Sequence, residues 1–147
     1  MEKTGTPKDT ALRVASDLLE IKAIQLNKSQ PFTWSSGWKS PIYCDNRMSL
    51  SFPATRTYIK KALAEACKSL YPEAQSIAGV ATAGIPQGAL LADEVDLPFI
   101  YVRSSPKGHG MENLIEGKVA PGQKVVIVED LISTGGSSLK AAEALKA

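Results

Sequence analysis

The sequence predicts an α/β protein in which helices flank a parallel central sheet. Three apolar segments have the length and composition of buried strands: residues 76–81, 97–102 and 125–128. Helical patterns alternate with them along the chain, which is typical of a parallel sheet. Ligands of such sheets bind at the carboxyl ends of the strands, so the loops that follow these segments are the expected functional site.

Composition indicates an ordinary protein of one domain. The chain has 147 residues, a formal net charge of +2 and 22% charged residues, so its charge does not point to a nucleic-acid partner. Cys44 and Cys67 show neither metal-ligand spacing nor a disulfide framework. Residues 1–8 are polar and no apolar run is long enough to span a membrane. We therefore expect a cytoplasmic enzyme or binding protein.

The N-terminal region has a helical pattern first and an aromatic segment after it. Thr6 and Pro7 are typical of a helix start, and an apolar stripe predicts a helix to about Ile24. Residues 30–50 are rich in aromatic and turn-forming residues, with short strands expected at 32–34 and 42–44 around a turn at Gly37. The pattern fits a lid over a planar ligand, and slightly favours a hydrophobic flap that only covers the core.

A second helix is expected to begin at Pro53. Its apolar residues recur at helical spacing, which places Cys67 in the core and not in a reactive site; they are Ile59, Ala62, Leu63, Ala66, Cys67 and Leu70. We expect residues 1–50 to form an N-terminal segment and residues 51–147 an α/β core, effectively within one domain.

The turn after the first core strand contains Gly84 and Pro86 and leads into a helix through about Glu94. The free N–H groups of a helix start suit an anion such as pyrophosphate. A plain strand-to-helix turn explains the same residues equally well.

The loop after the second core strand gathers basic residues, glycines and the single histidine in residues 103–110. A cationic loop with a mobile backbone suits closure over a departing pyrophosphate. The alternative is a solvated loop whose lysine and histidine have no role. Residues 113–118 are expected to form the return strand, and Pro121 and Gly122 a turn.

The third loop carries the most specific pattern. Glu129 and Asp130 end the strand, and hydroxyl residues and glycines occupy 133–138 before a helix expected from Leu139. Backbone N–H groups at a helix start bind phosphate, whereas adjacent carboxylates suit the hydroxyls of a sugar. The segment therefore predicts a site for ribose 5-phosphate, although an ordinary strand-to-helix turn is the simpler alternative.

Three of these segments resemble one known family. The acidic and glycine-rich loop is similar to the signature with which type I phosphoribosyltransferases bind phosphoribosyl pyrophosphate (PRPP). Residues 32–45 read Phe-Thr-x-x-Ser-Gly-x-Lys-Ser-Pro-x-Tyr-x-Asp and resemble the N-terminal hood of the orotate phosphoribosyltransferases. Residues 103–110 read Arg-x-x-x-Lys-x-His-Gly and resemble the catalytic loop of that family. The resemblance implies the type I phosphoribosyltransferase fold with a small N-terminal hood.

The resemblance also implies roles for particular residues. It assigns catalysis to Lys107, His109 and Asp130. The pyrophosphate loop would be Ala81, Thr82, Ala83 and Gly84, with a cis peptide bond between Ala81 and Thr82. Orotate would contact Tyr43, Cys44 and Ser133. PRPP would bind Arg103, Lys107, His109, Glu129, Asp130, Leu131, Ile132, Ser133, Thr134, Gly135, Gly136 and Ser137.

The implied reaction joins orotate and PRPP to give orotidine 5′-phosphate and pyrophosphate. Mg²⁺ would come mainly with PRPP, and a homodimer would use the loop at 104–116 in the neighbouring subunit's site. Family members continue through further strands that supply an arginine for the orotate carboxylate, so the resemblance implies weak orotate binding by a chain of this length. Two alternatives are a non-catalytic PRPP-binding regulatory domain and transfer to another base.

Overall fold

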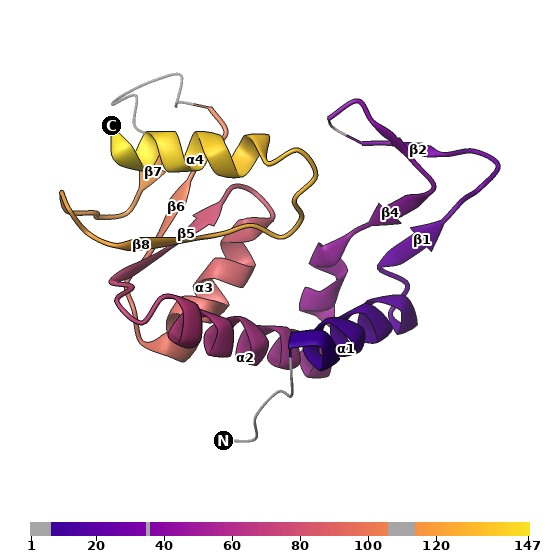
Figure 1. The fold of residues 1–147 in the computed structure, drawn as a ribbon, viewed down its shortest axis with the longest axis horizontal. Helices are drawn as coiled ribbons and strands as arrows, with labels where there is room; N and C mark the ends of the chain where they lie inside the picture. The colour runs from indigo at the N-terminus through magenta and orange to yellow at the C-terminus, as the bar shows by residue number, and fades with distance from the viewer. Residues whose placement is uncertain (1–6, 35, 106–113) are drawn as a thin grey trace. The chain divides into compact units, whose positions relative to one another are not determined.

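The computed structural model describes residues 7–34, 36–105 and 114–147 (Figure 1). Contacts within the chain define two compact units, Met1–Ala62 and Leu63–Ala147. The boundary falls inside α2 (Pro53–Leu70), which begins at the proline predicted to start it. The expected division after residue 50 stays a prediction.

The first unit begins with a helix and continues as short antiparallel strands. α1 (Pro7–Glu20) is followed by β1 (Ile24–Leu26), β2 (Phe32–Thr33), β3 (Lys39–Ser40) and β4 (Ile42–Cys44), and the 3-10 helix η1 spans Asn46–Ser51. β1 pairs with β4, and β2 pairs with β3.

Two predictions for this unit were wrong in detail. The first helix ends at Glu20 and not near Ile24, because Lys22 has a left-handed backbone (φ 60°) and Ile24 instead pairs with Cys44 in a strand. The two strands expected at 32–34 and 42–44 are present as β2 and β4, but the strand that pairs with β2 across the Gly37 turn is β3. The turn is tight, with Gly37 at φ 84° and the Trp34 N–H donating to the Trp38 carbonyl at 2.9 Å. The strand that directly follows the turn, β3, therefore pairs with β2.

The second unit contains the predicted α/β core. Its elements are β5 (Ser76–Val80), α3 (Gly84–Val95), β6 (Phe99–Val102), β7 (Ile115–Glu116), β8 (Val125–Val128) and α4 (Gly136–Lys146). The strands lie in the order β7-β6-β5-β8, with β6 and β8 parallel to β5, and β7 antiparallel to β6. The predicted fold class is therefore confirmed, as are the three core strands, the return strand and the turn at Pro121.

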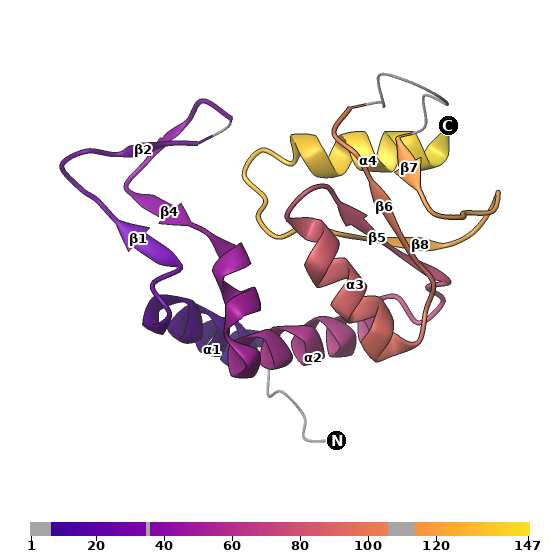
Figure 2. The same ribbon diagram turned by 180° about the vertical axis from the view of Figure 1, so that it is seen from behind.

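Side chains alternate between the two faces of this sheet. On one face Ile77 and Val128 pack with Cys67 of α2 and Leu91 of α3. On the other face Val80 and Val102 pack with residues of α4 such as Ala141. Figures 1 and 2 accordingly show α3 and α4 on opposite faces of the sheet. Successive side chains of each strand point to opposite faces of the sheet, and both faces are buried. A shift of one residue would exchange the two sets of side chains, so this burial fixes the register of the strands.

Three expectations about this core need correction. β8 is only half-buried apart from Val128, because it lies at one edge of the sheet among the described strands; the fully buried strand is β5. α4 begins at Gly136 and not at Leu139. In α2 Cys67 is buried as predicted, but Ala66 and Leu70 are exposed and Ala64 is buried in their place. Burial also raises the pKa of the Cys67 thiol, which agrees with a core role.

Within the described residues, every helix is too short or too polar to cross a membrane.

Candidate functional site

Three loops leave the sheet at its carboxyl edge. β5 pairs in register with both neighbours, so that Val80 lies opposite Val102 and Gly79 opposite Val128. The next residue of each neighbouring strand is Arg103 or Glu129, and the Ala81 N–H donates to the Val102 carbonyl at 2.8 Å. The predicted pyrophosphate loop, the start of the basic loop and the acidic loop therefore begin side by side.

Two glycines let the first and third loops approach each other. A Cβ at Gly84 would lie 2.6 Å from the Val128 carbonyl oxygen and 3.4 Å from the Cα of Glu129. A Cβ at Gly79 would lie 2.8 Å from the Gly84 carbonyl oxygen. Only glycine fits such backbone contacts. The Ala81–Thr82 peptide bond is cis, which confirms that expectation.

Both helices that start at this edge lack a side-chain cap. The N-cap of α3 is Ala83 and that of α4 is Gly135, which has a φ of 79°. Neither residue accepts a capping hydrogen bond from the first turn. The first N–H groups of a helix need a partner from outside the helix, and the positive end of its dipole favours an anion. Two such ends at one edge are suited to a ligand with two phosphate groups.

The two acidic residues are held differently. Glu129 accepts a hydrogen bond from the Asp130 N–H at 3.1 Å and another from the Ser137 hydroxyl at 2.7 Å. Burial raises the pKa of the Glu129 carboxyl, these two hydrogen bonds lower it, and the side chain and charge of Asp130 raise it again. Glu129 thus closes the loop onto α4, a contact that the sequence did not reveal. Asp130 is half-buried beside it.

The rest of the loop is open to solvent. Its exposed residues include the two apolar ones and most of the hydroxyls: Leu131, Ile132, Ser133, Thr134, Gly136 and Ser137. Ser138 is an exception; it lies in the predicted hydroxyl-rich segment 133–138 but is not among the predicted PRPP-binding residues. Its Oγ is buried and has no hydrogen-bond partner among the described residues. Its place in the first turn of α4, next to the predicted phosphate-binding residues, is the signal that could have identified it.

Arg103 is fixed at the base of the basic loop. Its N–H donates to the Leu114 carbonyl at 2.8 Å, and its Nη1 lies 3.5 Å from Glu116 Oε1. Glu116 is a second residue that the sequence analysis did not single out, because a strand glutamate twelve or more positions away gives no local signal. Lys107 and His109, predicted to be catalytic, lie outside the described residues.

Two of the predicted orotate residues lie in the first unit, while Ser133 lies in the second. The ring of Tyr43 is 5.5 Å from that of Phe32, and the thiol of Cys44 donates to Asn46 Oδ1 at 2.8 Å. The Trp34 indole N–H donates to the Ile42 carbonyl at 3.0 Å and ties the hairpin to β4. These contacts give the aromatic segment a defined internal structure.

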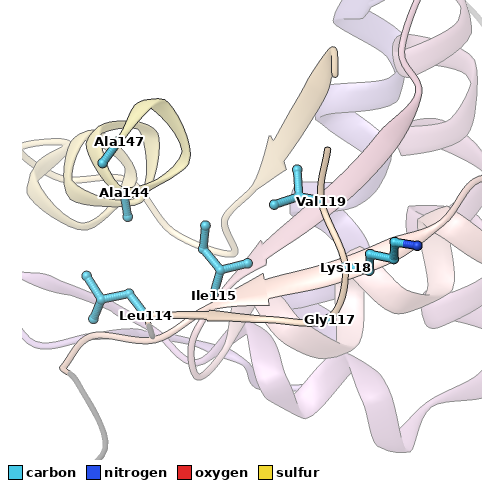
Figure 3. Close-up of a pocket in the computed structure, with 7 residues that line it drawn as sticks. All are labelled: Leu114, Ile115, Gly117, Lys118, Val119, Ala144 and Ala147. Carbon is cyan, nitrogen blue, oxygen red and sulfur yellow. The ribbon is translucent and has the colours of Figure 1, made fainter. Parts of the chain in front are cut away.

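A pocket of about 530 Å³, lined mainly by apolar residues, lies by the C-terminal end of α4 (Figure 3). Leu114 and Ile115 of the β7 segment and Ala144 of α4 are among its lining residues. None of the described residues that line it is a predicted site residue. In the described parts of the chain, no group of three or more His, Cys, Asp or Glu side chains could hold a metal ion.

Comparisons with known proteins agree with this geometry. Residues 53–147 match the model of the phosphoribosyl transferase domain family. The chain is 62% identical over 133 residues to an orotate phosphoribosyltransferase of Cytophaga hutchinsonii, covering 90% of this chain and 64% of that protein. The chain thus spans just under two thirds of the length of this curated relative.

Solved structures show the same fold. The crystal structure of orotate phosphoribosyltransferase from Aeropyrum pernix superposes with a TM-score of 0.77 at 34% identity, over 90% of this chain and 73% of that one. An adenine phosphoribosyltransferase from Saccharomyces cerevisiae has a TM-score of 0.66 at 23% identity, over 92% of this chain and 82% of that one, a likeness of fold alone. The fold is thus shared by proteins that act on different bases.

Proposed function

The chain belongs to the phosphoribosyltransferase family, and on this premise we propose that it provides the PRPP-binding core of an orotate phosphoribosyltransferase. The reaction joins orotate to the ribose 5-phosphate of PRPP and releases pyrophosphate. The high identity to the Cytophaga protein supports this choice over transfer to another base. A cytoplasmic location goes with the proposal.

The observation that carries the proposal is the pair of helix starts at one sheet edge, each without a side-chain cap and with two carboxylates close by. PRPP carries a phosphate at one end of its ribose and a pyrophosphate at the other. We assign the 5′-phosphate to the hydroxyls and N–H groups at 133–137, and the pyrophosphate to residues 81–84 with Arg103. Glu129 and Asp130 would then face the ribose hydroxyls, because carboxylates repel phosphate but accept hydrogen bonds from hydroxyls.

The chemistry needs no protein nucleophile. As pyrophosphate departs, positive charge develops on the ribose ring and negative charge on the leaving group. The carboxylate of Asp130 stabilises the first, while Arg103, Lys107 and the start of α3 stabilise the second. His109 would donate a proton or a hydrogen bond to the departing oxygens. Holding both substrates in line supplies much of the remaining rate enhancement.

Mg²⁺ fits this site as a companion of PRPP. It prefers oxygen ligands and retains several waters, so the oxygens of pyrophosphate and ribose could hold it with help from the adjacent carboxylates Glu129 and Asp130. Bound there, it would neutralise charge on the leaving group. The chain's own contribution is the pair of carboxylates at the end of β8.

For the base, Tyr43 and Cys44 with Ser133 are proposed to bind orotate. A panel of orotate, uracil and purine bases, each assayed for PRPP-dependent pyrophosphate release, tests this. Pyrophosphate release with orotate and with no other base supports the assignment. Release with a purine and not with orotate contradicts it. PRPP binding without release on any base would favour a regulatory role.

The proposal includes a homodimer in which Lys107 and His109 serve the neighbouring subunit's site. Lys107→Ala and Asp130→Asn should each abolish most activity when tested alone. After subunit exchange between the two variants, one site of each mixed dimer carries both changes and the other carries neither. Recovery of activity supports action across the dimer. If exchange is verified and the mixture stays inactive, the loop acts within its own subunit.

A further inference from the structure

A further acidic residue of the described core, Glu116, contacts Arg103 at the end of β6. Tyr101 lies opposite Glu116 in the antiparallel pair of β6 and β7, and the next hydrogen bond joins the Arg103 N–H to the Leu114 carbonyl at 2.8 Å. Paired residues of antiparallel strands share a face, and the pattern repeats every two residues. Arg103 and Glu116 are therefore diagonal neighbours on one face, a distance that long side chains can bridge.

The contact between them is partly shielded from solvent. Arg103 Nη1 lies 3.5 Å from Glu116 Oε1, and the two side chains are only 27% and 25% exposed. Nη1 itself is buried and makes no hydrogen bond to any described residue. A separation of 3.5 Å is an ion pair but is long for a hydrogen bond. Glu116 thus forms an ion pair with one nitrogen of the Arg103 guanidinium.

We infer that Glu116 is a positioning residue for PRPP binding: it fixes the guanidinium of Arg103 at the end of β6 so that the remaining N–H groups face the ligand. This rests on the proposed function. An arginine side chain loses much rotational freedom when it binds an anion, and a partner that holds it beforehand reduces that loss. Arg103 presents several donors in a rigid fork, so one can be held by Glu116 while others bind phosphate oxygens.

The charge of Glu116 also acts against PRPP binding, because it partly neutralises Arg103 and so weakens the attraction of Arg103 for an anion. Two substitutions separate the effects. Glu116→Gln removes the charge and keeps a polar side chain of the same length beside Nη1, whereas Glu116→Ala removes both. If positioning dominates, only the alanine variant binds PRPP poorly. If neutralisation dominates, both variants bind PRPP more tightly than the wild type.

The experiment measures PRPP affinity by isothermal titration calorimetry in the presence of Mg²⁺. The proteins are the wild type, Glu116→Ala, Glu116→Gln, Arg103→Ala and the double alanine variant. Glu73→Ala is the matched control, since it breaks the ion pair of Glu73 with Lys124 at the opposite edge of the sheet. Urea unfolding of each variant shows whether the fold is retained.

We expect Glu116→Ala to weaken PRPP binding about tenfold, Glu116→Gln to stay within about threefold of the wild type, and Glu73→Ala to have no effect. In the Arg103→Ala background, Glu116→Ala should cause no further loss, because its effect passes through Arg103. A purely structural role for Glu116 would lower affinity in both backgrounds.

Unchanged or tighter binding by Glu116→Ala, or an equal loss in the Arg103→Ala background, would overturn the positioning role while leaving the proposed function intact. Should Glu116→Ala prove unfolded, the comparison of Glu116→Gln with Glu116→Asp replaces it. The shorter side chain of Glu116→Asp cannot reach Nη1 of Arg103, so this variant should bind PRPP more weakly than Glu116→Gln. A wild type that does not bind PRPP at all refutes the proposed function, and the inference with it.

Discussion

The two edges of the same sheet are built in opposite ways. At the amino edge, the chain satisfies its own polar groups: the Gln75 N–H donates to the Lys124 carbonyl at 2.8 Å, and the Lys124 N–H donates to Gln75 Oε1 at 2.9 Å. Gln123 adds a side-chain hydrogen bond to the Gln75 carbonyl at 3.2 Å. At the carboxyl edge, α3 and α4 start without side-chain caps.

This difference between the edges indicates which edge of the sheet is suited to bind a ligand. Backbone donors that find no partner within the protein are costly unless water or a ligand satisfies them. At the amino edge, the backbone groups of Gln75 and Lys124 are satisfied by hydrogen bonds within the protein. The carboxyl edge has two helix starts without side-chain caps, two carboxylates and a half-buried guanidinium. Each of the following changes tests one side of this comparison.

The largest effect is expected from Asp130→Asn at the carboxyl edge. The amide keeps the size of the side chain but removes the charge that we assign to the ribose hydroxyls. Loss of a charge-assisted hydrogen bond costs about 1.5–3 kcal/mol, which is a ten- to hundredfold loss of PRPP affinity. Calorimetry with PRPP and Mg²⁺ measures it. Wild-type affinity in this variant would remove Asp130 from the site.

Gly84→Ala should come next, because the new Cβ would lie 2.6 Å from the Val128 carbonyl oxygen. That atom belongs to the backbone of β8 and cannot turn aside, so we expect a loss of about 1–3 kcal/mol in the free energy of unfolding. Urea denaturation measures this loss.

The control for that change is Gly136→Ala, at the first residue of α4. Its Cβ would meet only Thr134 Oγ1, at 3.9 Å. Alanine in a helix should leave the free energy of unfolding unchanged or raise it by up to about 1 kcal/mol. Equal losses in the two variants would show that the close approach of the loops is not what Gly84 provides.

A smaller effect concerns the pH dependence of stability through Glu129. Its pKa is raised in the folded protein, chiefly by burial, above an ordinary value of 4.5. The folded state then binds more protons than the unfolded state as pH rises from about 4.5 through the raised pKa, so stability falls across that interval. Thermal unfolding at several pH values should show this component in the wild type and not in Glu129→Gln. Identical pH profiles would contradict the raised pKa.

The smallest effect is expected at the amino edge. Glu73 and Lys124 form an exposed ion pair, and such pairs contribute about 0–1 kcal/mol. Glu73→Gln should therefore change the free energy of unfolding little and PRPP affinity not at all. A clear loss of PRPP affinity in this variant would mean that the two edges are not functionally distinct.

Much of the core could be predicted because its signals are local. Pro53 marks a helix start, and the runs that form β5, β6 and β8 are apolar enough to identify as strands. The errors come from contacts between distant residues. Ile24 continues a helical pattern in sequence, but its pairing with Cys44 makes it a strand. Val125–Val128 looks fully buried in sequence, yet its exposure depends on which strand lies beside it.

The site was predictable to the same extent. The order of strand, acids, hydroxyls and glycines predicts a ligand-binding loop at 129–137, because each residue type suits one part of PRPP, and this assignment stays a prediction. The hydrogen bond from Ser137 to Glu129 and the ion pair of Arg103 with Glu116 could not be predicted. The first depends on how the loop folds back, and the second on the register of β6 against β7.

The most direct test of the difference between the two edges is a titration of the isotope-labelled protein with PRPP and Mg²⁺, followed by amide chemical shifts. If PRPP binds the carboxyl edge, the largest changes fall on residues 82–85, on Arg103 and on residues 133–138, while Gln75, Gln123 and Lys124 at the amino edge do not move. Changes centred on the amino edge, or an absence of changes at both helix starts under saturating PRPP, would contradict it.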